Sequence, residues 1–359
     1  MKHCTLTERI DQLLGDGRVA DIILRPGIPL RYSIHDRFQI DPDVVVGEED
    51  FASIVKEAGL NCEAKDDDRQ WKRGNRSLRC NLLTAQGIPQ ICMRIFPAKP
   101  PLFDDQQCDF PKSPELRQKI LEPKKGIIFL VGTPGSGKST TCAALIHEYA
   151  RLNDRHILTF EDPIEFVYPT DLKSLISQRD MRTDMVSELL ALKSGLRQVP
   201  SLLVVQEIRD EPTAALVLIL ASLGIRVITT IHADTACEAV GSFLKWLDGK
   251  RWSWGCFMLS KYLVCSIAQR LVTAVGDNSR RYVLHELLWA KPTPRSRAVS
   301  NLIAQAAKDE HSLDGLDGQI LNGGSDTLHI SWRSSLERWE QAGVKFDESL
   351  ADELSNLSR

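Results

Sequence analysis

The chain has 359 residues, a formal net charge of −3, and hydrophobic and charged fractions of 43% and 26%. This length predicts about two domains with substantial cores, and the small net charge argues against a broad electrostatic surface for nucleic acid or membrane. Nine scattered cysteines without a C-x-x-C pair indicate reduced thiols rather than a disulfide framework or a zinc site. Residues 1–14 lack a signal-peptide core, and the apolar stretch 214–225 is too short to span a bilayer, so we expect a cytosolic chain with no transmembrane segment.

The pattern of residues 1–96 predicts a small α/β domain. The expected elements are helices over 5–14 and 48–58 and strands over 19–24, 30–34, 78–83 and 88–96. Asp66–Asp68 are expected in a solvated loop rather than in a metal site. The proline-rich, polar stretch 97–113 has the composition of a linker.

Helix and strand patterns alternate from residue 114 to residue 290. The expected strands are 126–131, 156–160, 201–205 and 227–231, and the expected helices are 114–121, 139–152, 184–198 and 213–223. Such alternation predicts a mainly parallel sheet covered on both faces, with ligands at the carboxyl ends of its strands. The tail 291–359 is expected to be helical over 298–307 and 329–342, with a glycine-rich polar segment at 314–326.

The stretch 132–140 fits the pattern G-x-x-x-x-G-K-[ST] between an expected strand and an expected helix. Gly135 and Gly137 allow backbone N–H groups to turn inward, where they and the helix N-terminus form an anion cradle. Lys138 can reach the β- and γ-phosphates of a nucleotide, and the Ser139 hydroxyl can ligate Mg²⁺. A chance match in a chain this long is of order one in a hundred. The expected nucleotide-binding residues are Gly132, Thr133, Pro134, Gly135, Ser136, Gly137, Lys138, Ser139 and Thr140.

Acidic residues follow two of the expected strands. Glu161, Asp162 and Glu165 come after strand 156–160, where a carboxylate could orient or deprotonate an attacking water, although solvent-facing loop acids are the simpler explanation of this group alone. Glu207 follows the buried-type strand 201–205, which is a Walker B pattern whose acid holds Mg²⁺ through water.

Three further residues are candidates for contact with phosphate. His232 follows strand 227–231 and is placed to sense a γ-phosphate, although a lone histidine is more often structural. Arg79 and Arg94 lie in the first domain. Surface arginines usually do nothing specific, but charge developing on a transferred phosphoryl group requires a guanidinium, which a neighbouring subunit can supply.

Together, these segments resemble the secretion ATPase superfamily of type II secretion, type IV pili and type IV secretion, nearest its PilT-like and Dot/Tra-type members. The matching segments are the Walker A stretch 132–141, the Asp box HILTFEDPIEFVY at 156–168, the Walker B segment SLLVVQEIRD at 201–210, the His box TTIHAD at 229–234, AQRLV at 268–272, and the hairpin that carries Arg79 and Arg94. The tetracysteine zinc insert of many type II members is absent, which favours the PilT or Dot/Tra branch.

The resemblance implies an α/β fold with a PAS-like N-terminal domain and a RecA-like P-loop domain. It implies a homo-hexameric ATPase that uses ATP and Mg²⁺ at the cytoplasmic face of the inner membrane, with platform or secretion-complex proteins as partners and no direct nucleic acid contact. Hydrolysis would move the first domain against the second about linker 97–113. The implied roles are catalytic base for Glu165, Walker B acid for Glu207, phosphate sensing for His232, Mg²⁺ binding for Ser139 and Glu207, and nucleotide-facing charge for Arg79 and Arg94.

The chain departs from the family pattern at three places. Gln206 stands where a glycine usually precedes the Walker B glutamate, Leu223–Gly224–Ile225 replaces a common Thr-Gly-His triplet, and residues 179–182 alter an arginine and acid pattern. Gln206 adds bulk beside the expected metal position and would slow turnover. This leaves a second hypothesis open, in which the chain is a hydrolysis-impaired, ATP-binding regulator or scaffold of the same machinery.

Overall fold

The computed structural model describes residues 5–34, 37–61, 63–64, 66–74, 76–97, 99–102, 114–122, 124–182, 184–185, 187–208, 210–247, 249–290, 297–307 and 329–357. The chain divides into two compact units. The first unit comprises Met1–Pro100 with Glu165–Val167, and the second comprises Pro101–Ile164 with Tyr168–Arg359.

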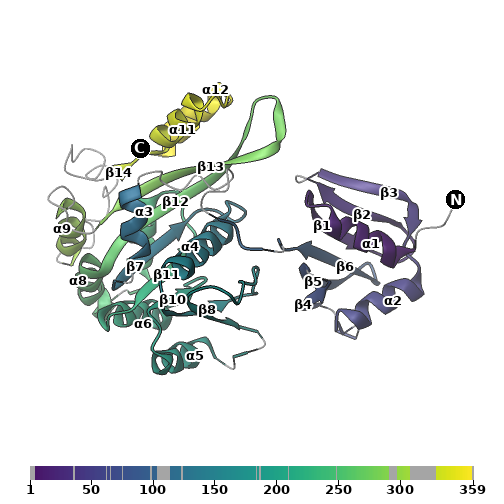
Figure 1. Ribbon diagram of the computed structural model, residues 1–359, viewed down its shortest axis with the longest axis horizontal. Helices are drawn as coiled ribbons and strands as arrows, with labels where there is room; N and C mark the ends of the chain where they lie inside the picture. The colour runs from purple at the N-terminus through teal and green to yellow at the C-terminus, as the bar shows by residue number, and fades with distance from the viewer. Residues whose placement is uncertain are drawn as a thin grey trace. The chain divides into compact units, whose positions relative to one another are not determined.

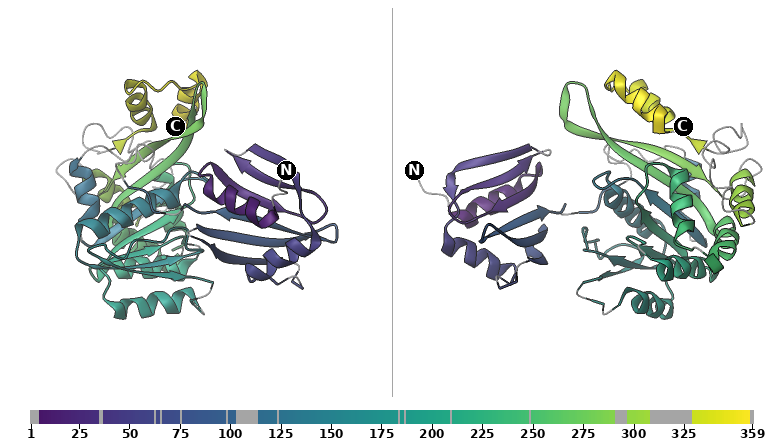
Figure 2. Two further views of the ribbon diagram at one scale, coloured as in Figure 1. Left: turned by 45° about the vertical axis from the view of Figure 1, so that its right-hand side comes forward. Right: turned by 180° about the vertical axis from the view of Figure 1, so that it is seen from behind.

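The first unit is a six-stranded antiparallel sheet with helices α1 and α2 packed on one face (Figures 1 and 2). The strand order is β3-β2-β1-β6-β5-β4. The elements are α1 (Leu6–Gly15), β1 (Val19–Leu24), β2 (Pro29–Ile34), β3 (Arg37–Val45), α2 (Glu48–Glu57), β4 (Asp66–Arg73), β5 (Arg76–Ala85) and β6 (Ile88–Ile95).

Local sequence explains how this unit forms. Thr5 and Glu8 make a reciprocal capping box that starts α1, and the apolar face of α1, including Ile10, is buried against the sheet. β3 was not expected. Asp66–Asp68 begin strand β4 and pair with β5, so the predicted loop is wrong. Carboxylates are tolerated in this strand because arginine and asparagine side chains of neighbouring positions bind them, as Arg79 binds Asp68.

The second unit contains a mixed, mainly parallel eight-stranded sheet in the order β14-β13-β12-β7-β11-β10-β8-β9. Pairs from β12 to β9 are parallel, whereas β13 and β14 are antiparallel to their neighbours. The strands are β7 (Gly126–Val131), β8 (His156–Glu161), β9 (Leu175–Asp180), β10 (Leu202–Val205), β11 (Arg226–Ile231), β12 (Leu263–Ala274), β13 (Asp277–Trp289) and β14 (His329–Ile330). The helices are α3 (Pro114–Leu121), α4 (Lys138–Leu152), α5 (Glu188–Gly195), α6 (Glu211–Ser222), α7 (Ala236–Lys245), α8 (Trp252–Tyr262), α9 (Arg297–Ala306), α11 (Trp332–Gln341) and α12 (Glu348–Leu357), with 3₁₀ turns at Leu196–Gln198 and Gly249–Arg251.

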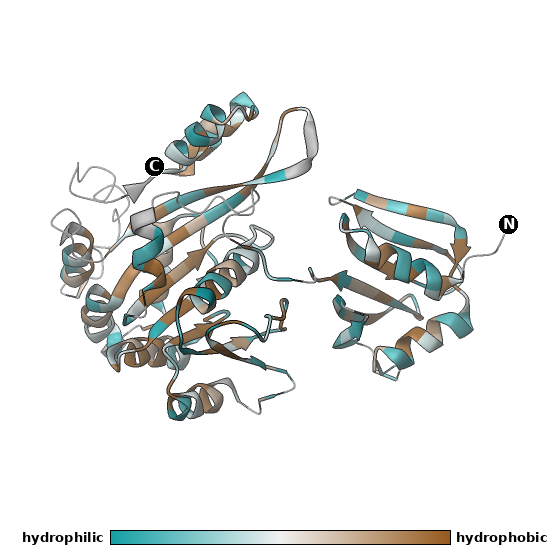
Figure 3. Ribbon diagram, viewed as in Figure 1, coloured by the Kyte–Doolittle hydropathy of each residue, from teal (hydrophilic) through white to brown (hydrophobic). Residues whose placement is uncertain are grey.

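Strand β7 lies inside the core of this unit, and all six of its residues are buried. Its odd-numbered side chains pack with α6 and α7, and the Phe129 and Phe243 rings lie 5.0 Å apart. Alternation along the strand turns Ile128 and Leu130 to the other face, where α4 lies (Figure 1). Strands β7 and β10 are therefore buried and apolar throughout, and hydrophobic colouring predominates in the central strands of Figure 3.

Helices at 297–306 and 332–341 confirm the expected helical tail in part. His329 and Ile330 instead pair with β13, so the second helix begins three residues later than expected. The segment 314–326 and most of the predicted linker lie outside the described residues. None of the helices in the described ranges has the length and apolar character that a membrane crossing requires.

Candidate functional site

The glycine-rich loop 132–137 connects buried strand β7 to helix α4. Gly135 and Gly137 have φ values of +78° and +87°, which side chains other than glycine rarely adopt. Gly137 caps α4 and brings no side chain to the amides of the first turn. These amides and the positive end of the helix are therefore available to an anion, which is the cradle that the sequence predicts.

Gly132 lies where the loop meets strand β12. A Cβ at this position would stand 2.5 Å from Ser136 Oγ and 2.7 Å from the Gln269 carbonyl oxygen. The fully buried Gln269 side chain donates from Nε2 to the Ser136 carbonyl at 2.7 Å. Gln269 is a site residue that the sequence reasoning missed, since the AQRLV segment matched the family without giving this glutamine a role.

Lys138 is the first residue of α4 and is buried inside the loop. Its Nζ donates to the carbonyl oxygens of Gly132 at 2.6 Å and Thr133 at 2.9 Å. Burial lowers the pKa of this ammonium, and the nearby Glu207 carboxylate acts in the opposite direction. A buried cation that is held by two loop carbonyls beside an anion cradle is suited to bind phosphate.

His232 connects the loop to the Walker B strand end. Its Nδ1 lies 3.4 Å from Lys138 Nζ, and its Nε2 lies 3.3 Å from Glu207 Oε1. Lys138 comes after β7 and its loop, His232 follows β11, and Glu207 follows β10. These three strands are neighbours in the order β7-β11-β10. The structure thus brings together three of the predicted site residues, of which Lys138 and His232 are 94 positions apart in the sequence.

The predicted Mg²⁺ ligands also lie in this region of the chain. Ser139 is in the first turn of α4 and Glu207 follows β10. A hydroxyl and a carboxylate are the oxygen donors that Mg²⁺ takes alongside nucleotide phosphates and water, so the donor chemistry fits. Within the described residues, no group of three or more His, Cys, Asp or Glu side chains is arranged as a metal site by itself.

The Asp box forms the end of β8 and the turn that follows it. Glu161 Oε1 accepts hydrogen bonds from Thr159 Oγ1 at 2.6 Å and from Gln178 Nε2 at 3.0 Å. Asp162 Oδ1 accepts from Arg182 Nε at 2.5 Å. Glu161 and Asp162 are thus held by neighbouring side chains rather than free in a solvent loop. Glu165 lies in the short segment that groups with the first unit.

Arg79 and Arg94 lie opposite one another on β5 and β6 of the first unit. Arg79 Nη2 lies 2.7 Å from Asp68 Oδ2, and Arg94 Nε lies 2.8 Å from Asp21 Oδ1. The hydrogen bond that Arg94 donates to the Asp21 carboxylate raises the pKa of Arg94. Both predicted arginines therefore have carboxylate partners that the sequence did not indicate.

Comparison with known proteins places these features in a family. A profile of the type II/IV secretion system protein family matches residues 70–313. The "Twitching motility protein" of Neisseria gonorrhoeae is 38% identical over 194 residues, 54% of this chain and 51% of the relative. The match thus covers about half the length of that curated relative.

Solved structures show the same fold. The crystal structure of the pilus retraction motor PilT with bound ADP has a TM-score of 0.74 at 26% identity, covering 93% of this chain and 96% of the other. The structure of the ATPase DotB from Legionella pneumophila has a TM-score of 0.78 at 21% identity, covering 100% and 98%. These similarities confirm the expected α/β fold class.

Proposed function

The chain belongs to the type II/IV secretion system protein family, a family of P-loop ATPases, and we propose that it is a homo-hexameric motor that hydrolyses ATP to drive a type IV pilus or a type IV secretion system. The observation that carries this proposal is the continuous line from Lys138 through His232 to Glu207. It joins a phosphate-binding cation, a polar sensor and a metal-binding acid at the carboxyl ends of adjacent strands.

The residues of the second unit have separate roles in this proposal. Loop amides and Lys138 would bind the phosphates, and Ser139 and Glu207, the latter through water, would hold Mg²⁺, which would supply positive charge beside the phosphates. His232 links the phosphate-binding lysine to Glu207. Its contacts with both would therefore change when a γ-phosphate binds to or leaves Lys138.

The remaining roles rest on the family resemblance. Glu165 is proposed as the base that activates water, and Arg79 and Arg94 as the guanidinium groups that stabilise the transition state. In the hexamer, some of these arginines act across a subunit boundary. Turnover would move the first domain relative to the second and transmit force to membrane-platform or secretion-complex proteins at the cytoplasmic face of the inner membrane.

The second candidate is an ATP-binding regulator or scaffold that hydrolyses slowly, and Gln206 is the residue that favours it. Steady-state ATP hydrolysis by the purified full chain separates the two. For a motor, we expect the wild type to exceed Glu165→Gln by about 10²-fold or more, with ATP affinity retained in the variant. Wild-type turnover no faster than that of Glu165→Gln, together with intact ATP binding, would refute the motor and leave the regulator.

A further inference from the structure

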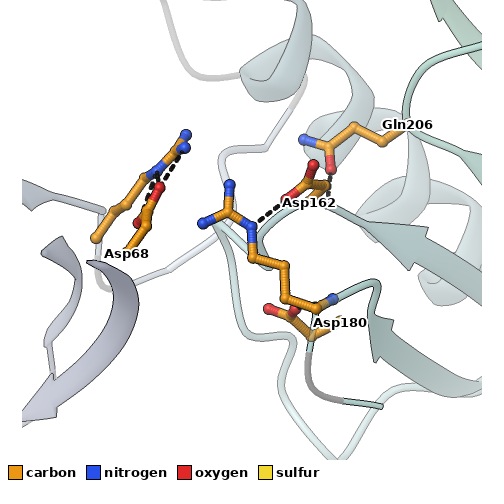
Figure 4. Close-up of polar contacts among 6 residues, drawn as sticks. Asp68, Asp162, Asp180 and Gln206 are labelled. Atoms are coloured by element: carbon orange, nitrogen blue, oxygen red, sulfur yellow. Dashed lines mark hydrogen bonds and ion pairs between the residues drawn. The ribbon is translucent and has the colours of Figure 1, made fainter. Parts of the chain in front are cut away.

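Gln206 does not simply add bulk beside the Walker B glutamate. Its backbone N–H donates to the Phe160 carbonyl at 3.1 Å, which extends the ladder between β10 and β8 by one position. Its side-chain Oε1 accepts a hydrogen bond from the backbone N–H of Asp162, as Figure 4 shows. A glycine at position 206 would have no side chain to make this contact, so the substitution creates a connection between the Walker B end and the Asp box.

Arg182 holds the same aspartate from the other side. It lies in the turn after β9, and its Nε contacts Asp162 Oδ1 at 2.5 Å. The arginine is itself anchored, because its backbone N–H donates to Oδ1 of the buried Asp180 at 2.8 Å (Figure 4). Asp180 accepts this bond while its own N–H donates to Asp184 Oδ2 at 2.9 Å.

Three adjacent strand ends are thus tied together at Asp162. β8 carries the aspartate, β10 supplies Gln206, and β9 supplies Arg182. The acids that flank these contacts are Glu161, which precedes Asp162, and Glu207, which follows Gln206. A shift of the Asp box relative to the Walker B strand would break the Gln206 contact, and a shift relative to the turn after β9 would break the Arg182 contact. An active site needs its groups held within a fraction of an ångström, and this pair of contacts limits such movement.

We propose that Gln206 and Arg182 are positioning residues that clamp Asp162 and thereby fix the Asp box relative to Glu207 for hydrolysis. This proposal rests on the proposed ATPase function. It reverses the expectation drawn from the sequence, because the glutamine then supports turnover. Gln206 and Arg182 both stand at positions where this chain departs from the family pattern.

The test is the ATPase kinetics of the full chain with Gln206→Met, which keeps side-chain length but cannot accept the Asp162 N–H. We expect kcat to fall about tenfold, the effect of losing one positioning hydrogen bond, while KM for ATP changes by less than about twofold. Gln206→Glu retains an acceptor oxygen and should remain within about threefold of wild type. Arg182→Met should also lower kcat about tenfold, whereas Arg197→Met, the matched loss of an exposed arginine, should leave it unchanged.

Coupling between the two arms provides a second readout. If both act through Asp162, the double variant Gln206→Met/Arg182→Met should lie within about threefold of either single variant, whereas independent effects would multiply to about a hundredfold. Melting temperatures monitor folding. If Gln206→Met fails to fold, the proposal is judged on the other two variants: kcat should stay within about threefold of wild type in Gln206→Glu and fall about tenfold in Arg182→Met.

Several results would overturn the clamp while leaving the ATPase function intact. They are an active wild type with unchanged kcat in Gln206→Met, multiplicative effects in the double variant, or a faster Gln206→Gly. A wild type no faster than Glu165→Gln would instead refute the proposed function, and the positioning role with it.

Discussion

Replacement of Gly132 by alanine tests the packing between the phosphate loop and strand β12. The backbone of Gly132 has a φ of +150°, and an added Cβ would stand 2.7 Å from the backbone carbonyl oxygen of Gln269. Ser136 Oγ, at 2.5 Å, could rotate away, but the Gln269 carbonyl belongs to a strand of the central sheet and cannot. Gly135→Ala is the matched control, because Gly135 also has a positive φ but has nothing within 4 Å of an added Cβ.

The expected difference in melting temperature between the two variants follows from the contact of the added Cβ with the Gln269 carbonyl. Both variants carry backbone strain of about 1–3 kcal/mol. Gly132→Ala adds overpacking of about 1–3 kcal/mol, which corresponds to a further fall in melting temperature of at least about 2 °C in a unit of this size. Melting is measured without nucleotide, because bound ligand would shift the transition and both glycines border the phosphate site. A melting temperature for Gly132→Ala within about 1 °C of the Gly135→Ala value would refute a rigid contact between loop and strand.

Three further outcomes are expected. Gln269→Met removes the buried donor to the Ser136 carbonyl. This variant should destabilise the folded chain by about 1–3 kcal/mol and weaken ATP binding. Unchanged stability and unchanged ATP affinity in calorimetry would contradict the role of Gln269 in the loop. Burial raises the pKa of Cys80 to about 12 and of Cys256 to about 11. Both therefore remain thiols at pH 8 and should resist alkylation until the chain unfolds, which mass spectrometry can measure. Alkylation of the folded chain at the rate of the unfolded chain would contradict the burial of these thiols. Burial also lowers the pKa of Arg226, whose Nε and Nη1 find no hydrogen-bond partner among the described residues. Arg226→Met should therefore maintain or raise the melting temperature, and a large decrease would show that this charge is compensated.

The sequence predicted the parts of the site that depend on short segments. The glycine spacing of 132–137 and its position between a strand and a helix predicted the loop, and the polar residue after each apolar strand made Glu207 and His232 candidates. It also predicted the alternating α/β class, because both strand and helix leave a periodic pattern. Strands β3, β4 and β9 escaped detection, since their exposed or charged residues hide that pattern. Strands β12 and β13 were also not predicted, although the AQRLV motif lies in β12.

The order of the strands in each sheet decided which distant side chains are in contact. Because β12 lies beside β7, Gln269 reaches the phosphate loop from 133 residues away. Because β8 lies between β9 and β10, Asp162 meets both Arg182 and Gln206. Sequence alone determined which residue types stand at the strand ends, since that information is local. Only the tertiary structure decided which of them touch, because the neighbours of a strand depend on pairing between distant segments.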